Sequence, residues 1–70
     1  MDIPIGTMFN YFYQDEEGTY TGKFTVIGHR SIRGKYIYII QWDDAKKTKE
    51  SISRVSMLDM IERKLFTLVA

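Results

Sequence analysis

Hydrophobic and polar residues alternate along much of this chain, and this period of two predicts β-strands. Residues 7–13 and 19–29 show the pattern first. The polar run at 14–18 between them ends in a glycine, which favours a turn. The first segment is rich in aromatic residues and has few polar positions, so we expect its strand to be buried on both faces.

The segment 35–42, KYIYIIQW, carries the strongest strand signal of the chain. Two largely apolar sets alternate along it, namely Tyr36, Tyr38, Ile40 and Trp42 against Ile37, Ile39 and Gln41. We therefore expect a central strand whose two faces are both covered, or whose second face is held against a partner. Turns are predicted at 30–34, closed by Gly34, and at 43–47, and a weaker, more exposed strand follows at 48–53.

The period changes near the end of the chain. Apolar residues then recur at helical spacing, at Val55, Leu58 and Ile61. Positions three and four apart lie on one side of a helix, so a short helix is predicted at about 56–64. Ser56 fits its N-cap, with Asp59 as the acid of a short capping box. Residues 65–69 have β composition again and are expected to complete the sheet.

The predicted order is β-β-β-β-α-β, with short connections throughout. Sequential strands joined by tight turns pair in antiparallel fashion. Closing such a sheet removes edges that apolar strands would otherwise expose. We therefore predict a mainly β protein: a five-stranded antiparallel small barrel, SH3-like, with one short helix at about 56–64 before the last strand. A length of 70 residues leaves room for one domain only, covering 1–70.

Composition narrows the classes of protein that remain. With 44% hydrophobic and 27% charged residues the chain is globular rather than disordered. Lys and Arg total 10 and Asp and Glu total 9, and this balance excludes a globally basic nucleic-acid binder. The chain has no cysteine, so it has neither disulfides nor a thiolate metal site. No apolar run reaches the ~20 residues of a membrane span, and the first residues do not read as a secretory signal, so we expect a cytoplasmic protein.

The charges are nevertheless segregated along the sequence. Residues 1–18 contain no Lys or Arg, whereas 19–42 contain no Asp or Glu. Acidic and basic turns on one small body would give a dipolar surface that can steer a charged partner. Lys46 and Lys47 form a second basic group on the next turn. Successive hairpin tips of a meander lie at opposite ends of the sheet, so the two basic groups merge only if a barrel brings them together.

Catalytic chemistry is poorly supplied. His29 is the single histidine, no nucleophile stands at a motif-like spacing from it, and a strand-end histidine in contact with solvent or backbone is the simpler interpretation. Asp43 and Asp44 could ligate a divalent cation, but Lys46 and Lys47 follow at once, and a turn is favoured. We therefore predict a protein that is not an enzyme, with no metal site and no cofactor.

Binding chemistry is better supplied. Aromatic side chains next to cations form the surface that nucleotides and single strands favour, since stacking contributes ~1–3 kcal/mol per base. The predicted ligand- or partner-binding residues are Arg30, Arg33, Lys35, Tyr36, Tyr38, Trp42, Lys46 and Lys47. The competing interpretation is that the aromatic members, Tyr38 and Trp42 above all, belong to the core. The surplus of tyrosines also suits a protein–protein interface, including one between copies of the chain.

The run 38–45, YIIQWDDA, followed by 51–54 and Met57-Leu58, resembles SH3-like barrels of the Tudor and chromo-barrel type. In those barrels the third strand ends Trp-Asp-Asp-Gly, and here Ala45 takes the place of the glycine. No four aromatic residues have the spacing of a methyl-lysine cage, so the resemblance implies the fold and not the ligand. The runs 23–29 and 34–36 are similar to the opening strands of small DNA-binding β-sheet modules in phage proteins.

The compact, cysteine-free, aromatic-rich style is similar to that of small phage-encoded host-takeover and anti-defence proteins. The leading hypothesis is therefore a phage-type, non-enzymatic binding protein that inhibits or sequesters a host protein or a nucleotide signal through an aromatic and basic surface. A nucleotide could be held at the interface of a homo-oligomer, with Arg30, Arg33 and Lys35 on its phosphates. The alternative is a nucleic-acid-binding SH3-like module. A third hypothesis is an enzyme subunit that uses His29. No membrane partner is expected.

Overall fold

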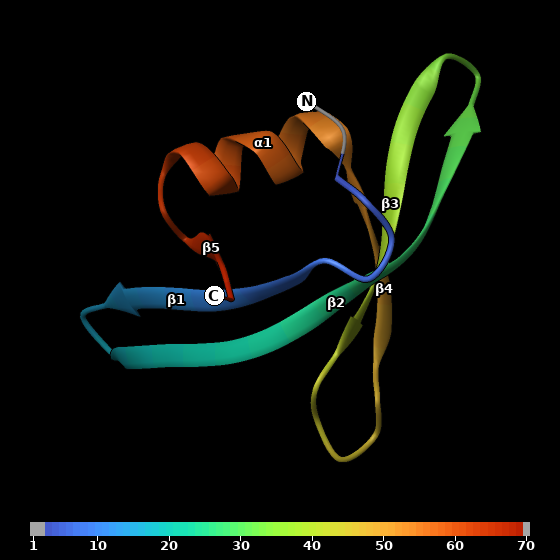
Figure 1. Cartoon of the computed structure of the whole chain (residues 1–70). Helices are drawn as coiled ribbons and strands as arrows, with labels where there is room; N and C mark the ends of the chain where they lie inside the picture. Colours follow the sequence, from blue (N-terminus) through green and yellow to red (C-terminus); the bar gives the residue numbers. More distant parts are fainter. Residues whose placement is uncertain (1–2, 70) are drawn as a thin grey trace.

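A computed structural model describes residues 3–69 of the chain as one antiparallel sheet and one helix (Figure 1). The elements are β1 (Met8–Asp15), β2 (Gly18–Ile32), β3 (Lys35–Trp42), β4 (Lys49–Ser53), α1 (Arg54–Glu62) and β5 (Phe66–Leu68). The strand order is β4-β3-β2-β1-β5, and every neighbouring pair is antiparallel. The mainly β class, the five strands and the helix before the last strand are thereby confirmed.

The sheet is not closed into a barrel. β4 and β5 stand at the two ends of the strand order. Helix α1, which connects them, packs against β3, β4 and β5 and covers the side of the sheet where closure would occur (Figure 1). Since β5 has only three residues and pairs with β1 alone, the helix rather than a further strand pairing shields the core.

β2 is the strand that both halves of the sheet share. Its first half pairs with β1, from Asp15↔Gly18 to Met8↔Thr25, and its second half pairs with β3, from Phe24↔Trp42 onward. A β-bulge lies between Val26 and Gly28 and adds a residue to β2 alone. Two ribbons therefore leave the centre in different directions: the β1–β2 hairpin and the β2–β3 hairpin (Figure 1).

The strands run further into the predicted turns than the sequence pattern indicated. In the β1–β2 turn, Asp15 Oδ1 accepts hydrogen bonds from the backbone N–H groups of Glu17 (2.8 Å) and Gly18 (3.1 Å). In the β2–β3 turn, Arg33 and Gly34 both have positive φ, 50° and 80°. This is the two-residue turn whose twist matches that of the adjoining strands. Both hairpins consequently end in short tips that project from the body.

The core lies between the sheet and α1, and half of its buried residues are aromatic. Its buried members are Ile3, Phe9, Phe24, Val26, Tyr38, Ile40, Met57 and Phe66. Phe24 lies at its centre, with ring centroids 5.3 Å from Phe9, 4.8 Å from Phe66 and 5.1 Å from Trp42. The expectation that the first strand is buried on both faces is wrong, because Met8 and Phe12 on its outer face are exposed.

The helix begins earlier than predicted. Ser53, not Ser56, is the N-cap, and its Oγ accepts a hydrogen bond from the Ser56 N–H at 3.2 Å. β4 runs directly into α1 at Ser53, so a serine three residues ahead of the predicted one takes the capping role. The apolar stripe shifts accordingly: Met57 is buried, whereas Val55 is 80% exposed.

Candidate binding surfaces

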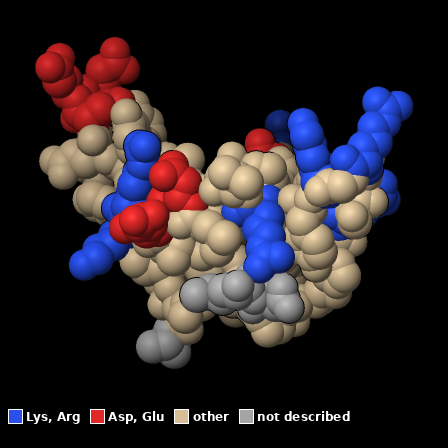
Figure 2. All heavy atoms as spheres, turned by 90° about the horizontal axis from the view of Figure 1, so that it is seen from above, with Lys and Arg blue, Asp and Glu red and all other residues tan. Residues whose placement is uncertain are grey.

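Three predicted site residues gather at the tip of the β2–β3 hairpin. Arg30, Arg33 and Lys35 are all exposed. The register places Arg30 opposite Ile37 and Lys35 opposite Ile32, while Arg33 occupies the turn itself. Lys and Arg side chains accordingly project at this end of the molecule, on the right of Figure 2. We call these three residues with Tyr36 the basic hairpin surface.

Tyr36 is half-buried on the opposite face of the hairpin from Arg30 and Lys35, and it already contacts two charged or titratable side chains. His29 of β2 stacks on its ring, with centroids 5.4 Å apart and an interplanar angle of 17°. The Arg54 guanidinium carbon lies 5.6 Å from the ring centroid, in a cation–π contact. These contacts come from β2 and from the start of α1 beside β4, the elements on the two sides of β3. The ring is therefore not a free platform for a stacking base.

Sequence reasoning missed both of these neighbours as parts of a binding surface. The sequence analysis considers His29 as a catalytic base or as a strand-end histidine in contact with solvent or backbone, although an antiparallel hairpin closed at Gly34 places it near Tyr36. The position of Arg54 next to Tyr36 depends on the pairing of Ile37 with Ser53, which brings the start of the helix beside β3. No local pattern in the sequence signals that pairing.

A hollow of about 450 Å³ opens beside the basic hairpin surface. It is lined by Gly34, Lys35, Tyr36, Ser53, Arg54 and Val55. Its volume lies within the ~300–1,000 Å³ of ordinary small-ligand sites. The hollow thus offers room for a small anionic group next to Lys35.

Tyr38 and Trp42 do not join this surface. Tyr38 is fully buried, which is the core interpretation that the sequence left open. Trp42 is half-buried against Phe24 and Tyr11, and its Nε1–H donates a hydrogen bond to the Glu50 carboxylate. Both side chains stabilise the fold in this arrangement.

Lys46 and Lys47 lie at the β3–β4 turn, which projects at the end opposite the β2–β3 tip (Figure 1). The two basic groups are therefore not brought together. Lys47 Nζ forms an ion pair with Asp43 at 2.9 Å, and this hydrogen bond lowers the pKa of Asp43 and raises the pKa of Lys47. Asp44 accepts hydrogen bonds from the Thr48 N–H (3.0 Å) and Oγ1 (2.9 Å), which lower its pKa. The aspartates thus build the turn, as the favoured interpretation held.

A second exposed surface lies at the tip of the β1–β2 hairpin. Asp15, Glu16 and Glu17 form the turn, and Tyr13 and Tyr20 stand behind it as a cross-strand pair with centroids 6.2 Å apart. Asp and Glu side chains accordingly project at the left end in Figure 2. We call these five residues the acidic hairpin surface. The well-exposed aromatic rings therefore accompany the anions, whereas the predicted binding residues combine Tyr36, Tyr38 and Trp42 with cations.

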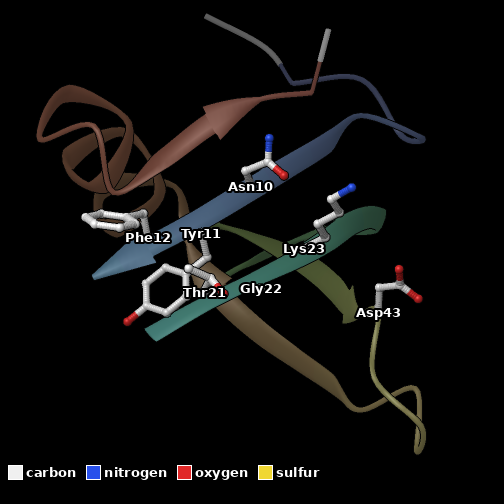
Figure 3. A pocket seen from close by; sticks show the side chains of 7 residues that line it. All are labelled: Asn10, Tyr11, Phe12, Thr21, Gly22, Lys23 and Asp43. Atoms are coloured by element: carbon white, nitrogen blue, oxygen red, sulfur yellow. The ribbon is translucent and has the colours of Figure 1, made fainter. Parts of the chain in front are cut away.

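Another hollow, of about 510 Å³, lies along the β1–β2 ribbon (Figure 3). It is lined by Asn10, Tyr11, Phe12, Thr21, Gly22, Lys23 and Asp43. Figure 3 shows these side chains spread over both strands and the start of the β3–β4 turn, rather than converging on one point. A site that orients a small molecule needs polar groups that converge, so this hollow is the weaker candidate.

Comparison of the chain with family models, curated proteins and solved structures returned no match. Among residues 3–69, no helix has both the length and the apolar character needed to cross a membrane. Within the same residues, no three His, Cys, Asp or Glu side chains are grouped so that they could hold a metal ion. The functional argument therefore depends on the two charged hairpin surfaces.

Proposed function

We propose that this chain is a small, non-enzymatic binding protein that inhibits or sequesters a negatively charged partner through the basic hairpin surface. The observation that carries the proposal is the set of three exposed cations on one projecting tip. Within residues 3–69, none of the three is engaged in an ion pair. Cations that the fold does not itself neutralise are available to a partner.

Arginine favours two kinds of anionic group. Its planar guanidinium binds carboxylate and phosphate oxygens in pairs, which gives both strength and orientation. The hollow beside Lys35 and Tyr36 has room for one such group. A host protein with an acidic surface would supply a carboxylate, and a nucleotide signal would supply a phosphate. Both are partners of the kind that the phage-type hypothesis requires. The antiparallel meander with its helix before β5 also supports an SH3-like classification as part of this proposal.

Nucleic acid is the second candidate partner, and it is favoured by the projection of the cations on a narrow two-stranded ribbon. Three phosphate contacts would give log K a slope of about −2 to −3 against log salt. Stacking would add little, because Tyr36 already contacts His29 and Arg54. We therefore rank an acidic protein or a nucleotide above single-stranded nucleic acid.

The test is affinity capture from host lysate, with mass spectrometry of both proteins and small molecules. The variant Arg30→Ala/Arg33→Ala removes two cations from the basic hairpin surface. Lys46→Ala/Lys49→Ala removes the same charge from the β3–β4 region and is the matched control. We expect the wild type and the control to retain the same partner and the Arg30/Arg33 variant to lose it, with a nearly unchanged thermal midpoint.

Equal capture by all three proteins would contradict the proposal. A collapse of the fold in the Arg30→Ala/Arg33→Ala variant would show instead that these arginines are structural. The nucleic-acid candidate is tested separately, by fluorescence anisotropy with a labelled oligonucleotide at about 50 mM salt. Absence of binding there would remove it.

A further inference from the structure

The acidic hairpin surface has no role in the proposed function, although it is the more aromatic end of the molecule. Tyr13 and Tyr20 are 40% and 46% exposed, and Phe12 on the other face of the same ribbon is 48% exposed. β5 pairs with β1 only at residues 9–11, so the ribbon extends beyond the part of the sheet that α1 and β5 cover. Exposed aromatic rings grouped in this way are typical of an interface.

The charges around these rings indicate which partner would fit. Glu16 and Glu17 are exposed at the turn, and the tyrosines behind them present π-faces to a cation. Arg63 and Asp59 from the end of α1 form an ion pair of their own at 3.2 Å. The surface therefore suits guanidinium or ammonium groups carried on a narrow element.

The chain itself carries such an element at its other end. The tip of the β2–β3 hairpin is narrow, projects from the body and presents Arg30, Arg33 and Lys35 (Figures 1 and 2). The two tips point in different directions on a body 37 Å long, so one copy cannot bring its own two surfaces together. A second copy can.

We infer that the acidic hairpin surface of one copy binds the basic hairpin surface of a second copy, so that the chain associates head to tail. The arginines of one tip would lie on Tyr13 and Tyr20 of the other, with their guanidinium groups against Glu16 and Glu17. Two different surfaces meet in such a contact, so it propagates into a ring or an open chain rather than ending at a symmetric dimer. Two hairpin tips bury little area, so we expect weak association that salt screens.

The inference does not depend on the proposed function, but the two use the same cations. Capture of an anionic partner would therefore compete with self-association. This competition makes the failure of one distinguishable from the failure of the other, provided that the two surfaces are altered separately.

The experiment alters one end at a time and then mixes the products. Glu16→Lys/Glu17→Lys reverses the acidic tip and spares Asp15, whose carboxylate holds the turn. Arg30→Glu/Arg33→Asp reverses the basic tip, and aspartate is chosen at position 33 because it tolerates the positive φ there. The first variant then has basic residues at both tips and the second has mainly acidic residues at both tips, so only a mixture of the two contains complementary tips.

The readout is sedimentation velocity and light scattering over a range of protein concentrations, at about 50 mM and about 500 mM salt. We expect the wild type to exceed the monomer mass at low salt and each variant alone to remain monomeric. The equimolar mixture should regain mass above the monomer at low salt, because the tips of one variant are opposite in charge to those of the other. Lys46→Glu/Lys49→Glu, a charge-matched change elsewhere, should associate as the wild type does.

A wild type that stays monomeric up to about 1 mM at low salt would overturn the inference. So would a mixture that remains monomeric, or either variant associating alone. Mass that is regained on mixing at low salt and lost again at high salt indicates an ionic contact between the two variants. Circular dichroism of each variant checks that it is folded. Partner capture separates the two proposals, because Glu16→Lys/Glu17→Lys should still capture the anionic partner.

Discussion

Replacement of Tyr38 by phenylalanine is expected to make this protein more stable. The ring is fully buried in the core, and its hydroxyl has no hydrogen-bond partner among the residues that the structure describes. A buried polar group left unpaired costs about 1–3 kcal/mol. Tyr38→Phe keeps the ring and removes only the group that carries this cost.

The gain is reduced by the space that the oxygen leaves. A void of about one water probe, ~15 Å³, costs roughly 0.4 kcal/mol at ~24 cal/mol per Å³. The net increase in the free energy of unfolding is therefore about 1 kcal/mol if the unpaired hydroxyl costs an amount in the lower part of the range of about 1–3 kcal/mol. In a domain of this size that corresponds to a rise of about 4–8 °C in the melting temperature.

Urea denaturation and calorimetry measure the change directly. Tyr20→Phe is the matched control, because this ring is 46% exposed and its hydroxyl has access to water. We expect the control to stay within about 0.5 kcal/mol of the wild type. A Tyr38→Phe variant that is less stable by 1 kcal/mol or more would refute the reasoning, since its hydroxyl would then have a partner in solution.

Three further changes test the local contacts that hold the fold. Ser53→Ala removes the helix cap and should lower the free energy of unfolding by about 1 kcal/mol, whereas Ser53→Asp, which can still cap, should lose much less in the same urea titration. Asp44→Ala should lower the free energy of unfolding near neutral pH, because it removes a carboxylate whose hydrogen bonds hold its pKa below the usual 3.8. The difference in free energy from wild type should persist above that pH and shrink as the pH falls through the lowered pKa, so a difference that stays constant would contradict the assigned hydrogen bonds. Gly22→Ala would place a Cβ 3.3 Å from the indole that packs over it, so it should destabilise by roughly 1 kcal/mol and shift the tryptophan fluorescence, whereas Gly28→Ala, with its nearest contact at 3.7 Å, should be close to neutral and leave the emission unchanged.

The parts of this structure that sequence could predict are those fixed by neighbouring residues. The strand Lys35–Trp42 has the predicted bounds because an apolar run of period two ends at Gly34 on one side and at two aspartates on the other. The basic hairpin tip was likewise predictable, since a two-residue turn keeps Arg33 close to Lys35.

The parts that sequence could not predict depend on distant pairing. Whether the sheet closes depends on the length of β5 and on the position in which α1 packs against the sheet, and no local sequence pattern determines either. The pairing of Ile37 with Ser53 brings Arg54 to Tyr36, and no spacing in the sequence signals it. For the same reason the sequence does not decide whether Tyr38 and Trp42 lie in the core or on the surface, because an alternating apolar strand does not indicate which face of the sheet the helix covers.

Only Phe24 and Thr25 of β2 have ladder partners on both sides, Phe9 and Met8 in β1 and Trp42 and Gln41 in β3. Outside this short crossing each position of β2 has a ladder partner on one side only, so the outer part of either hairpin can fray while the other hairpin stays intact. Opening of the crossing itself separates the two halves of the molecule and amounts to global unfolding. Within β2 the slowest hydrogen exchange is therefore expected at these two residues, and the charged tips should be the most mobile parts of the two hairpins.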